Sequence, residues 1–402
     1  MKVVCISPDD LSALIFCKTL SRLLGERKGT ELVTIGGQVE GLDSNLYAKE
    51  VQRDLRSKHF GIPMKRFVSP WHDFIYFIRI YKLLKRERCD VVITFTTKPN
   101  IWGQFAAILA GVPKRIIAVR GLGRVFSSSS TRKDHVLLRT MKFLYRLSCA
   151  RADRVWFTNE SDMNYLKSAG IVVESQVFMT RNAVDLSDFS NDAMDDASVL
   201  ELRQSLRLSP SDKVVVMVAR LIEQKGIKEF AEAAVMLRDR VPNLHFLLVA
   251  PEEPDNPSRV PLSYIHHIEA NANFQWLGFR KDVRVLYALA DLSVLPSYYK
   301  EGGYPRALLE AMAYGKPVIA ADTNECRGPV DDGKNGYLVP PKNAEALADA
   351  IYKIATNSEL AHIMGQHSLE KMKAEFDDRV ILGMLINEVI FPPSKHCNAF
   401  IV

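Results

Sequence analysis

Short runs of β-branched and other apolar residues alternate with longer stretches of helical periodicity along the whole chain. This alternation is typical of parallel strands joined by helices that cover the sheet. In the first half, the apolar runs predict strands at 3–7, 32–36, 91–95, 115–119, 154–158 and 176–179. In the second half, they predict strands at 214–219, 244–250, 274–277, 292–295, 317–320 and 337–339. The pattern therefore indicates an α/β protein with two doubly wound sheets in tandem.

The periodicity fails between the two series of strands, in a polar and acidic stretch that follows Asn182. We therefore predict an N-terminal domain at 1–185, a linker at 186–212 and a C-terminal domain at 213–375. A final helix at about 376–395 is predicted to pack back onto the N-terminal domain. Two domains agree with a length of 402 residues, which exceeds the usual size of one hydrophobic core. Ligands of such sheets bind beyond the carboxyl ends of the strands, so we expect the site in a cleft between the domains.

The two halves of the chain differ in net charge, although the net charge of the whole chain is only +6. Residues 1–185 hold 30 Lys and Arg against 17 Asp and Glu, whereas residues 186–402 hold 23 against 30. A net of +13 beside a net of −7 predicts an anionic partner for the first half, such as a membrane surface or a lipid phosphate. The stretches 74–88 and 132–154 interleave aromatic residues with Lys and Arg, as helices on an anionic membrane do. Helices that only cover a core are the alternative.

The cysteines and the first residues bear on location. Six cysteines lie far apart and form no C-x-x-C pair, which predicts reduced thiols in a cytosolic protein. The opening MKVVCISPDD lacks the apolar core of a signal peptide, and no run of about 18 apolar residues is present. We therefore expect a cytoplasmic protein that works on the inner face of the cytoplasmic membrane.

Two cations leave the first strand of the second half. In VVVMVARLIEQKGIKEF, a buried run is followed by Arg220 and, five residues later, by Lys225 just before a helix. Arginine grips phosphate oxygens bidentately and lysine adds a mobile charge, so the pair suits a diphosphate. A pair of surface cations near a helix start is the alternative.

A glycine-containing loop follows the predicted strand at 292–295. The loop carries Glu301, Gly302 and Gly303, and Pro305 is well placed to begin a helix. Backbone N–H groups at such a helix start can approach an anion, so the loop predicts a cradle for phosphate or sugar. Glu310 lies two turns further along the helix on a face of small residues, where a carboxylate needs a partner. A structural acid is the alternative for Glu310, and a plain loop acid for Glu301.

These segments resemble the retaining family 4 glycosyltransferases of GT-B fold. Three motifs match in order and spacing: R-L-x-x-x-K-G at 220–226, E-G…P-R-x-L-L-E-A-M-A-x-G-x-P-V-I-A at 301–320, and D-G-x-N-G-x-L-V at 332–339. The resemblance covers most of the chain and is strong from about 214 to 340. It implies two Rossmann-like domains that face a central cleft.

The resemblance also implies roles for individual residues. Arg220 and Lys225 would neutralise the donor diphosphate, Glu310 would bind the ribose hydroxyls, and Glu301 would contact the transferred sugar. Backbone N–H groups near the sugar would come from Gly302, Gly303 and Tyr304. The base would lie against the loop formed by Gly278, Phe279 and Arg280.

The chain departs from the family pattern in two places. Eight residues separate Glu301 from Glu310, where the family usually has seven. The first strand is followed by Pro8, Asp9 and Asp10 in place of a glycine-rich loop.

Two later segments of the first half, TTKPN and VRGLGRVF, resemble those of bacterial transferases that act on polyprenyl-diphosphate-linked sugars. Thr97 and Arg120 stand near positions where the family has His or Glu. Acceptor binding is expected from a set of polar and basic residues in these segments: Thr97, Lys98, Asn100, Arg120 and Arg124. Loop cations without a ligand are the alternative.

We therefore predict a retaining hexosyltransferase that uses a nucleotide-sugar, expected to be a UDP-sugar, and a saccharide acceptor that is lipid-linked, in bacterial surface polysaccharide or glycan synthesis. No D-x-D signature precedes a predicted strand end, and the His266-His267 pair lacks a third ligand, so we expect no metal and no cofactor. A sugar-nucleotide epimerase, a phosphorylase and a non-catalytic binding subunit share this architecture and stay open. A dehydrogenase is disfavoured because no G-x-G-x-x-G follows the first strand, and no nucleic-acid-binding motif is present.

Overall fold

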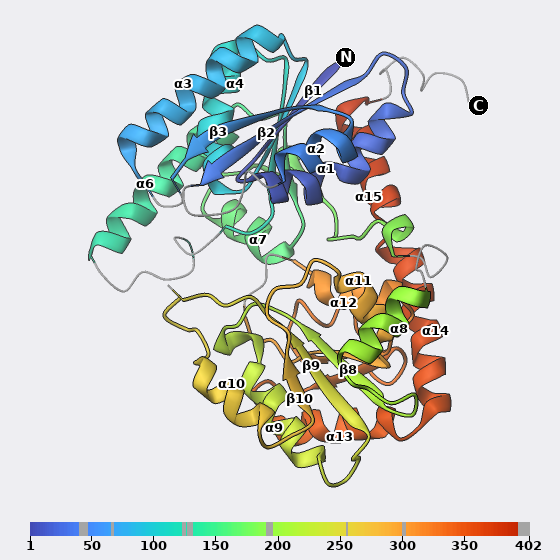
Figure 1. The fold of residues 1–402 in the computed structure, drawn as a ribbon. Coiled ribbons are helices and arrows are strands. Elements are labelled where there is room, and N and C mark those ends of the chain that lie inside the picture. Colours follow the sequence, from blue (N-terminus) through green and yellow to red (C-terminus); the bar gives the residue numbers. More distant parts are fainter. Residues whose placement is uncertain are drawn as a thin grey trace, which may run out of the picture. The chain divides into compact units, whose positions relative to one another are not determined.

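The computed structural model describes residues 1–39, 47–65, 68–122, 126, 132–189, 196–254, 256–299 and 303–392. The chain divides into two compact units (Figure 1). Unit 1 comprises Met1–Arg181 and Arg379–Val402, and unit 2 comprises Asn182–Asp378. By sequence, unit 1 holds 32 Lys and Arg against 17 Asp and Glu, and unit 2 holds 21 against 30. The contrast in charge thus follows the structural division.

Unit 1 is built on a seven-stranded parallel sheet with the order β3-β2-β1-β4-β5-β6-β7. Its strands are β1 (Lys2–Ser7), β2 (Glu31–Val39), β3 (Lys58–Met64), β4 (Val91–Phe95), β5 (Lys114–Val119), β6 (Arg154–Phe157) and β7 (Val177–Met179). Its helices are α1 (Asp10–Gly25), α2 (Ala48–Leu55), α3 (Pro70–Glu87), η2 (Pro99–Gly103), α4 (Gln104–Ala110), α6 (Arg132–Cys149) and α7 (Glu160–Ser168), with a short 3-10 turn at Glu174–Gln176.

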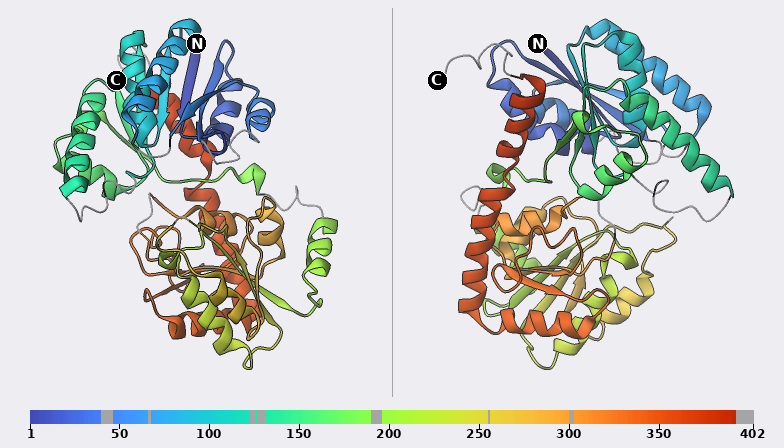
Figure 2. Two further views of the ribbon diagram at one scale, coloured as in Figure 1. Left: turned by 60° about the vertical axis from the view of Figure 1, so that its left-hand side comes forward. Right: turned by 180° about the vertical axis from the view of Figure 1, so that it is seen from behind.

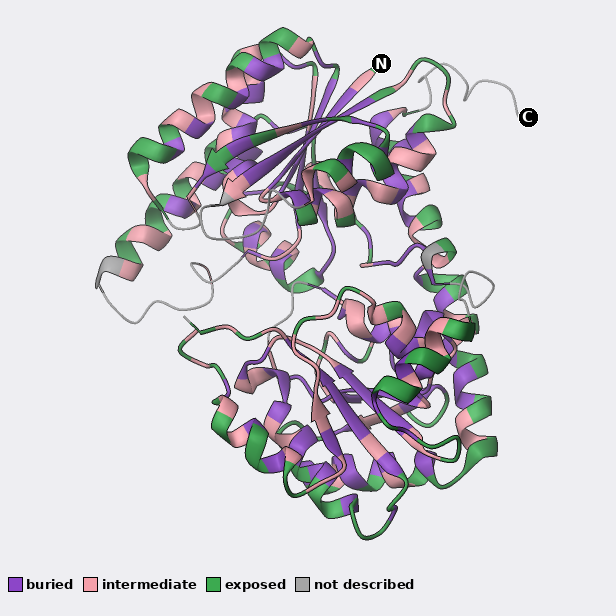
Figure 3. Ribbon diagram, viewed as in Figure 1, coloured by how far each residue is buried: buried purple, intermediate pink, exposed green. Residues whose placement is uncertain are grey.

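Alternate residues of the strands bury opposite faces of this sheet. Val3 and Cys5 of β1 pack in one cluster with α1 and α2, whereas Val4 and Ile6 pack with α3 and α4 on the other face. The sheet is buried on both faces (Figure 3), as expected for parallel strands that helices cover on both sides.

The last helical segments of the chain complete unit 1. Helix α15 (Asp378–Met384) and η7 (Leu385–Ile390) place Leu382, Leu385 and Ile386 in the same core cluster as α1. Lys114 Nζ donates to the Val389 carbonyl oxygen over 2.6 Å. The return of the final helix to unit 1 can be followed in Figure 2.

Unit 2 has a six-stranded parallel sheet with the order β10-β9-β8-β11-β12-β13. Its strands are β8 (Lys213–Val218), β9 (Leu244–Val249), β10 (Phe274–Trp276), β11 (Leu292–Leu295), β12 (Val318–Ala321) and β13 (Gly336–Val339). Its helices are η4 (Leu186–Asp188), α8 (Asp196–Ser205), η6 (Glu223–Lys225), α9 (Ile227–Leu237), α10 (Leu262–Glu269), α11 (Val283–Leu289), α12 (Arg306–Ala313), α13 (Ala344–Ala355) and α14 (Ser358–Glu375).

The expected linker at 186–212 lies inside unit 2 rather than between the units. Helix α8 contacts α11, and Leu202, Leu206 and Leu208 join the core cluster of unit 2. The acidic composition of 182–198 concealed these apolar residues, which come only after it. Hydrophobic burial of the leucines is the reason that the segment packs as part of the unit.

Both sheets have the strand order of a doubly wound fold, so the predicted α/β class is confirmed. The order changes direction between β1 and β4 in unit 1 and between β8 and β11 in unit 2. Within the described residues, no helix is both long enough and apolar enough to cross a membrane.

Candidate functional site

The connections after β8 and β11 meet at the point where the strand order of unit 2 changes direction. Arg220 and Lys225 follow β8, and Tyr298 follows β11. The Tyr298 N–H donates to the Gln224 carbonyl oxygen over 2.9 Å, so the two connections are joined directly. The fold therefore brings the two predicted donor-binding segments together where such sheets bind ligands.

Close contact between these connections depends on Gly226. Its φ is +79°, and a Cβ atom there would lie 2.4 Å from the Pro296 carbonyl oxygen. No side chain fits at that distance, and the left-handed backbone also favours glycine. Gly226 thus lets η6, which ends at Lys225, pack against the end of β11.

Arg220 and Lys225 share one aromatic ring. Arg220 Cζ lies 4.9 Å from the ring centre of Tyr299, and Lys225 Nζ lies 5.1 Å from it. Arg220 Nη1 is also 3.7 Å from Glu253 Oε1 in the connection after β9. The two cations repel each other, and the negative face of the ring offsets part of that repulsion. The result is a site with two preformed positive charges, suited to a diphosphate.

Tyr299 and Glu253 were absent from the sequence prediction. Tyr299 stands two residues before Glu301, beside the loop that was predicted to hold a ligand. An aromatic residue next to predicted phosphate-binding cations was a usable signal for it. Glu253 carried no such signal, because only the fold brings the connection after β9 to Arg220.

Glu310 lies on α12 with a side chain that is 18% exposed. Burial raises the pKa of its carboxyl group, and the Arg306 guanidinium, 3.3 Å away, counteracts only part of that effect. Arg306 Nη1 also donates to the Ala183 carbonyl oxygen over 3.3 Å. The carboxylate is thus held on the helix, largely shielded from water, where it can accept hydrogen bonds from a bound hydroxyl.

The glycine-containing loop is described only in part. Glu301 and Gly302 lie outside the described residues, so their predicted contacts with the sugar stay predictions. Gly303 is buried with a φ of +127°, a backbone conformation that favours glycine. The Tyr304 ring packs against Gly328 and edge-on against Phe376, with ring centres 5.7 Å apart. The ring of Tyr304 therefore anchors the loop in the unit.

The connection after β10 presents the residues predicted to contact a base. Gly278 has a φ of +62°, and the Phe279 side chain is exposed at 59%. Arg280 Nε donates to Asp282 Oδ1 over 2.8 Å, and this pairing raises the pKa of Arg280 and lowers that of Asp282. An exposed ring beside a paired arginine can stack with a base without adding a further positive charge.

In unit 1, three residues predicted to bind the acceptor make internal hydrogen bonds. Thr97 Oγ1 donates to the Leu122 carbonyl oxygen over 3.3 Å, and Lys98 Nζ donates to Asp73 Oδ1 over 2.6 Å. Asn100 is buried and donates to the Ala118 carbonyl oxygen over 3.0 Å. Each of these side chains ties the connection after β4 to a neighbouring element. A direct contact of Asn100 with an acceptor would require that connection to rearrange.

Arg120 lies at the carboxyl end of β5, against two aromatic rings. Its Cζ is 4.5 Å from the ring centre of Trp156 on β6 and 5.2 Å from that of Phe16 on α1. Arg124, the other predicted arginine of this connection, lies outside the described residues.

A buried polar network at the start of α1 was not foreseen. His59 Nε2 lies 2.9 Å from Asp10 Oδ1, and His59 Nδ1 lies 2.9 Å from Thr34 Oγ1. A Cβ atom on Gly36 would lie 1.9 Å from Asp10 Oδ1, so the network fits only because residue 36 is glycine. Asp10 belongs to the Pro8-Asp9-Asp10 segment that departs from the family pattern. Its carboxylate thus contacts His59 on β3, a strand that the sequence prediction missed.

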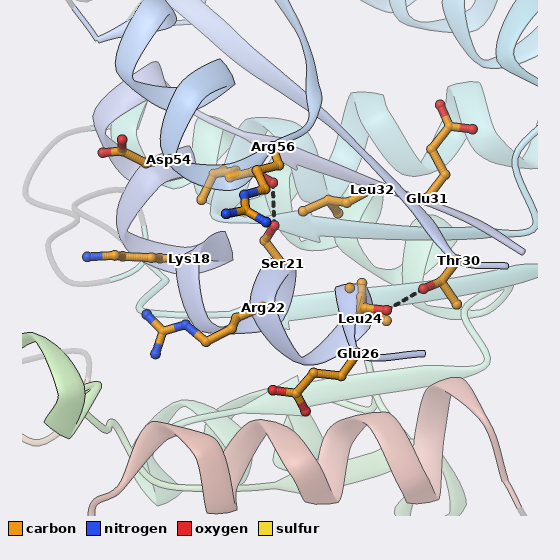
Figure 4. Close-up of a pocket in the computed structure, with 12 residues that line it drawn as sticks. Lys18, Ser21, Arg22, Leu24, Glu26, Thr30, Glu31, Leu32, Asp54 and Arg56 are labelled. Atoms are coloured by element: carbon orange, nitrogen blue, oxygen red, sulfur yellow. Dashed lines mark hydrogen bonds between the residues drawn. The ribbon is translucent and has the colours of Figure 1, made fainter. Parts of the chain in front are cut away.

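A pocket of about 560 Å³ opens elsewhere in unit 1, between α1, the start of β2 and the end of α2 (Figure 4). Charges of both signs line it, from Lys18, Arg22 and Arg56 and from Glu26, Glu31 and Asp54. It contains none of the residues predicted for the site. It lies beside the amino end of β2, whereas ligands of doubly wound sheets bind at the carboxyl ends.

The described residues contain no group of three or more His, Cys, Asp or Glu side chains that could hold a metal ion. His266, one of the adjacent histidines noted in the sequence, places Nδ1 3.0 Å from Glu269 Oε2 on the exposed side of α10.

Known proteins are similar to this chain in sequence and in fold. The family described as glycosyl transferases group 1 matches residues 198–371, and glycosyl transferase 4-like matches residues 44–159. An N,N'-diacetylbacillosaminyl-diphospho-undecaprenol alpha-1,3-N-acetylgalactosaminyltransferase of Campylobacter jejuni is 28% identical, over 76% of this chain and 78% of its own. A UDP-Gal:alpha-D-GlcNAc-diphosphoundecaprenol alpha-1,3-galactosyltransferase of Escherichia coli is 29% identical, over 84% of this chain and 86% of its own length.

Solved structures extend the likeness over the full fold. Anabaena HepE in complex with UDP and glucose has a TM-score of 0.75 at 17% identity and covers 96% of this chain and 98% of its own. WaaG, a glycosyltransferase involved in lipopolysaccharide biosynthesis, has a TM-score of 0.71 at 14% identity, covering 98% and 100%. Residues 198–371 are thus matched as a glycosyl transferases group 1 domain and residues 44–159 as a glycosyl transferase 4-like domain, in a chain that has the GT-B fold of these solved glycosyltransferases.

Proposed function

We propose that this glycosyltransferase transfers a hexosyl group from a UDP-sugar to a saccharide carried on a polyprenyl diphosphate, in the assembly of a bacterial surface polysaccharide or glycan. The observation that carries the proposal is the pair of cations on Tyr299, Arg220 and Lys225, with Glu310 on the same unit. A nucleoside diphosphate offers a complementary set of groups, because its phosphates need cations and its ribose needs an acceptor. A UDP donor is further supported by the names of the relatives.

The proposed reaction proceeds with retention at the anomeric carbon. The acceptor hydroxyl attacks this carbon while its bond to the diphosphate oxygen breaks, and the nucleoside diphosphate leaves with the bonding electrons. The proton of the hydroxyl passes to an oxygen of the departing phosphate, on the face where the new bond forms. Arg220 and Lys225 stabilise the charge that develops on the leaving group. Because two fixed cations can do the work of a divalent ion, we propose a reaction that needs no metal and no cofactor.

Unit 1 is proposed to bind the acceptor. Relatives named for diphospho-undecaprenol acceptors align over most of this chain, and unit 1 carries the net positive charge. A lipid diphosphate brings two anionic groups to the protein, which a basic unit attracts.

Unit 1 is further proposed to dock on an anionic membrane through the outer face of α3 and α6. On α3, Trp71 is 69% exposed and Phe74 is 49% exposed, and on α6 Phe143 is 57% exposed. Exposed cations share these helices: Arg79, Lys82, Lys85 and Arg86 on α3, and Arg139 and Arg146 on α6. Aromatic and basic side chains on one helix face suit the boundary between lipid headgroups and acyl chains. The inner face of the cytoplasmic membrane is the proposed location.

Transfer is tested with the full chain, a labelled UDP-hexose and a short polyprenyl diphosphate that carries one sugar. A labelled lipid-linked disaccharide with the α-linkage supports the proposal. An epimerised nucleotide sugar, a sugar phosphate or donor binding without turnover would identify the epimerase, the phosphorylase or the non-catalytic subunit instead. Transfer that persists in EDTA supports the metal-free reaction, and its loss would contradict it.

Docking is tested by flotation with vesicles of phosphatidylcholine alone or with phosphatidylglycerol. We expect binding to anionic vesicles that weakens as salt is raised, because each cation near the surface contributes about 1 kcal/mol and salt screens it. Trp71→Ala combined with Phe74→Ala should reduce flotation, whereas Ile363→Ala, a change at an exposed apolar residue on α14 of unit 2, should not. Equal flotation of all three proteins would argue against this face.

A further inference from the structure

Arg306 stands at the first position of α12, four residues before Glu310. The positive end of the helix dipole repels a cation at this position, and an arginine four residues before a glutamate is the less favourable order for an ion pair on a helix. The first turn of α12 contains no acidic residue that would offset the repulsion. Stability of the helix therefore gives no reason for an arginine at this position.

The guanidinium group of Arg306 joins two parts of unit 2. Its Nη2 lies 3.3 Å from Glu310 Oε1, and its Nη1 donates to the Ala183 carbonyl oxygen over 3.3 Å. The planar fork of an arginine holds its N–H donors in fixed directions, whereas the ammonium group of a lysine is a point charge on a flexible stem. One side chain thus links the Glu310 carboxylate to the backbone of residues 182–184.

Residues 182–184 give this link a fixed support. The Val184 N–H donates to the Phe376 carbonyl oxygen over 3.1 Å, and the Val184 side chain is buried in the core of unit 2. Asn182 Nδ2 donates to the Tyr304 carbonyl oxygen over 2.9 Å, in the loop that precedes α12. The same short segment therefore supports both the loop and the start of the helix.

The Glu310 carboxylate interacts with a titratable group on each of two helices. Burial raises the pKa of Glu310, and Arg306 on the same helix acts in the opposite direction. Tyr287 on α11 is buried, and burial raises its pKa well above the ordinary value, so its hydroxyl is neutral. This hydroxyl donates to the Ala307 carbonyl oxygen over 3.1 Å. Of these two groups, only Arg306 brings a positive charge to Glu310.

The other titratable residues on the elements that pack against α12 are exposed or paired. Strands β11 and β12 contain none. Arg284 on α11 is exposed, and Lys371 on α14 is paired with Asp331 Oδ1 over 2.6 Å. The remaining titratable residues of α14 are exposed: Glu359, His362, His367, Glu370, Lys373 and Glu375. Arg306 is therefore the cation placed to keep Glu310 ionised.

We propose that Arg306 is a positioning residue that holds the carboxylate of Glu310 ionised and oriented for the ribose hydroxyls of the donor, with residues 182–184 as its support. The inference rests on the proposed function, because it explains how the ribose-binding group is kept ready. An ionised carboxylate accepts stronger hydrogen bonds from hydroxyl groups than a neutral acid does. Arg306 thus contributes to the recognition of ribose and not to the binding of phosphate.

The preference for ribose over deoxyribose tests this role. UDP and 2′-deoxyuridine diphosphate are titrated calorimetrically into the wild-type protein and into Arg306→Gln from pH 5 to pH 9, and the ratio of the deoxy Kd to the UDP Kd is followed. The titration of the phosphates cancels in this ratio. In the wild type, the ratio should fall as the pH drops through the pKa of Glu310, because the protonated carboxyl group loses its charge-assisted hydrogen bond.

Arg306→Gln should change this profile in two ways. The midpoint of the fall should move upward by about one pH unit or more, because an opposite charge at hydrogen-bonding distance has been removed. At pH 9 the ratio should stay about 3-fold to 10-fold below that of the wild type, because an ionised but unsupported carboxylate is less well oriented. Arg306→Lys should restore the midpoint but not the full ratio, because the charge returns without the fork.

Two further variants control the measurement. Arg306→Gln combined with Glu310→Gln should show the ratio of Glu310→Gln alone, because the arginine acts through the carboxylate. Arg240→Gln removes an exposed arginine whose Nη1 lies 3.6 Å from Asp349 Oδ1, and it should leave the ratio and the midpoint unchanged.

The outcomes separate this inference from the proposed function. An unchanged ratio and midpoint in Arg306→Gln would overturn the inference, as would an equal loss of affinity for both nucleotides at every pH, which would indicate that Arg306 binds phosphate directly. If Arg306→Gln does not fold, a lowered ratio in Arg306→Lys at pH 9 supports the inference and a wild-type ratio overturns it.

Transfer is a separate readout. A wild-type protein that prefers ribose and loses this preference in the Arg306 variants, but transfers no sugar, would retain the inference and lose the proposed function. If UDP does not bind, the same ratios are measured with ADP and GDP and their deoxy forms, because the inference concerns the ribose and not the base. Binding of none of the three nucleotides would overturn both proposals.

Discussion

Both units place cations on aromatic rings at the carboxyl ends of their strands, but the rings come from different parts of the fold. In unit 2, Arg220 and Lys225 share the ring of Tyr299, which belongs to a connection after β11. In unit 1, Arg120 contacts Trp156, which belongs to a strand and is buried. A ring on a connection can move together with the loop that carries it, whereas a ring in the core holds a cation in place. The ring of Tyr299 can therefore shift with its connection, whereas the ring of Trp156 is fixed in the core of unit 1.

The largest effect is expected from the two cations of unit 2. Arg220→Ala or Lys225→Ala should each lower kcat by about 100-fold to 1000-fold, because a preorganised charge that stabilises the leaving group is lost. Single-turnover kinetics with labelled UDP-sugar measure the effect. Arg238→Ala, which removes an exposed cation paired with Asp239, should leave the rate unchanged. Near-normal turnover of folded Arg220→Ala and Lys225→Ala proteins would show that these residues do not bind the donor diphosphate.

A smaller effect is expected at Glu310. Glu310→Gln should weaken UDP binding by about 10-fold to 100-fold, because the amide keeps the volume of the side chain and loses a charged acceptor for the ribose hydroxyls. Calorimetric titration with UDP and with deoxyuridine diphosphate measures it. The variant should lose most of the preference for the ribose form. If the preference survives intact, the carboxylate has a structural role with Arg306.

The ring of Tyr299 distinguishes the two units most directly. Tyr299→Leu should raise the KM for the donor by roughly 3-fold to 30-fold and leave the KM for the acceptor unchanged, because both cations of unit 2 lose their shared π face. Tyr299→Phe should behave as the wild type. If Tyr299→Leu changes the KM values for donor and acceptor equally, the ring has no specific role in donor binding.

The smallest effect concerns stability against pH. Burial raises the pKa of Glu310 in the folded protein above its ordinary value of 4.5. At a pH between the ordinary pKa and the raised pKa, the folded protein therefore binds more protons than the unfolded chain. Its contribution to stability is greatest below the ordinary value and is lost as the pH rises through the raised pKa. Glu310→Gln removes this dependence. Thermal unfolding from pH 4 to pH 8 should show the variant gaining in Tm relative to the wild type as pH rises, and a constant difference would argue against the raised pKa.

Most of the central strands were predictable because they are runs of apolar residues that are buried on both faces. The predicted runs at 91–95 and 292–295 coincide with β4 and β11. The missed strand, β3, lies at the edge of its sheet, contains Gly61 and Pro63, and buries only His59, Ile62 and Met64 of its seven residues. Such a sequence resembles a loop, because an edge strand tolerates proline, which a central strand excludes.

The candidate site was predictable where one segment carries its own chemistry. Arg220, Lys225 and Glu310 were identified from local spacing, and the structure adds the neighbours that arrive from elsewhere in the chain. Glu253 and the Asp10–His59 pair depend on contacts between elements far apart in the sequence, which no local pattern contains. Lys98 was predicted from a resemblance and stays a prediction, and the structure adds its ion pair with Asp73 on α3, which no local pattern contains.

The chain completes its first unit with its final helix, and this order has a consequence for synthesis. A ribosome releases residues 182–378 before α15, so unit 2 can close its core while the α1 side of unit 1 still lacks Leu382, Leu385 and Ile386. During that interval an apolar surface of the nascent chain stays open to chaperones and to neighbouring nascent chains. Unit 1 matures last although it is made first, so a premature stop after residue 378 would release a folded unit 2 attached to a unit 1 with an uncovered core.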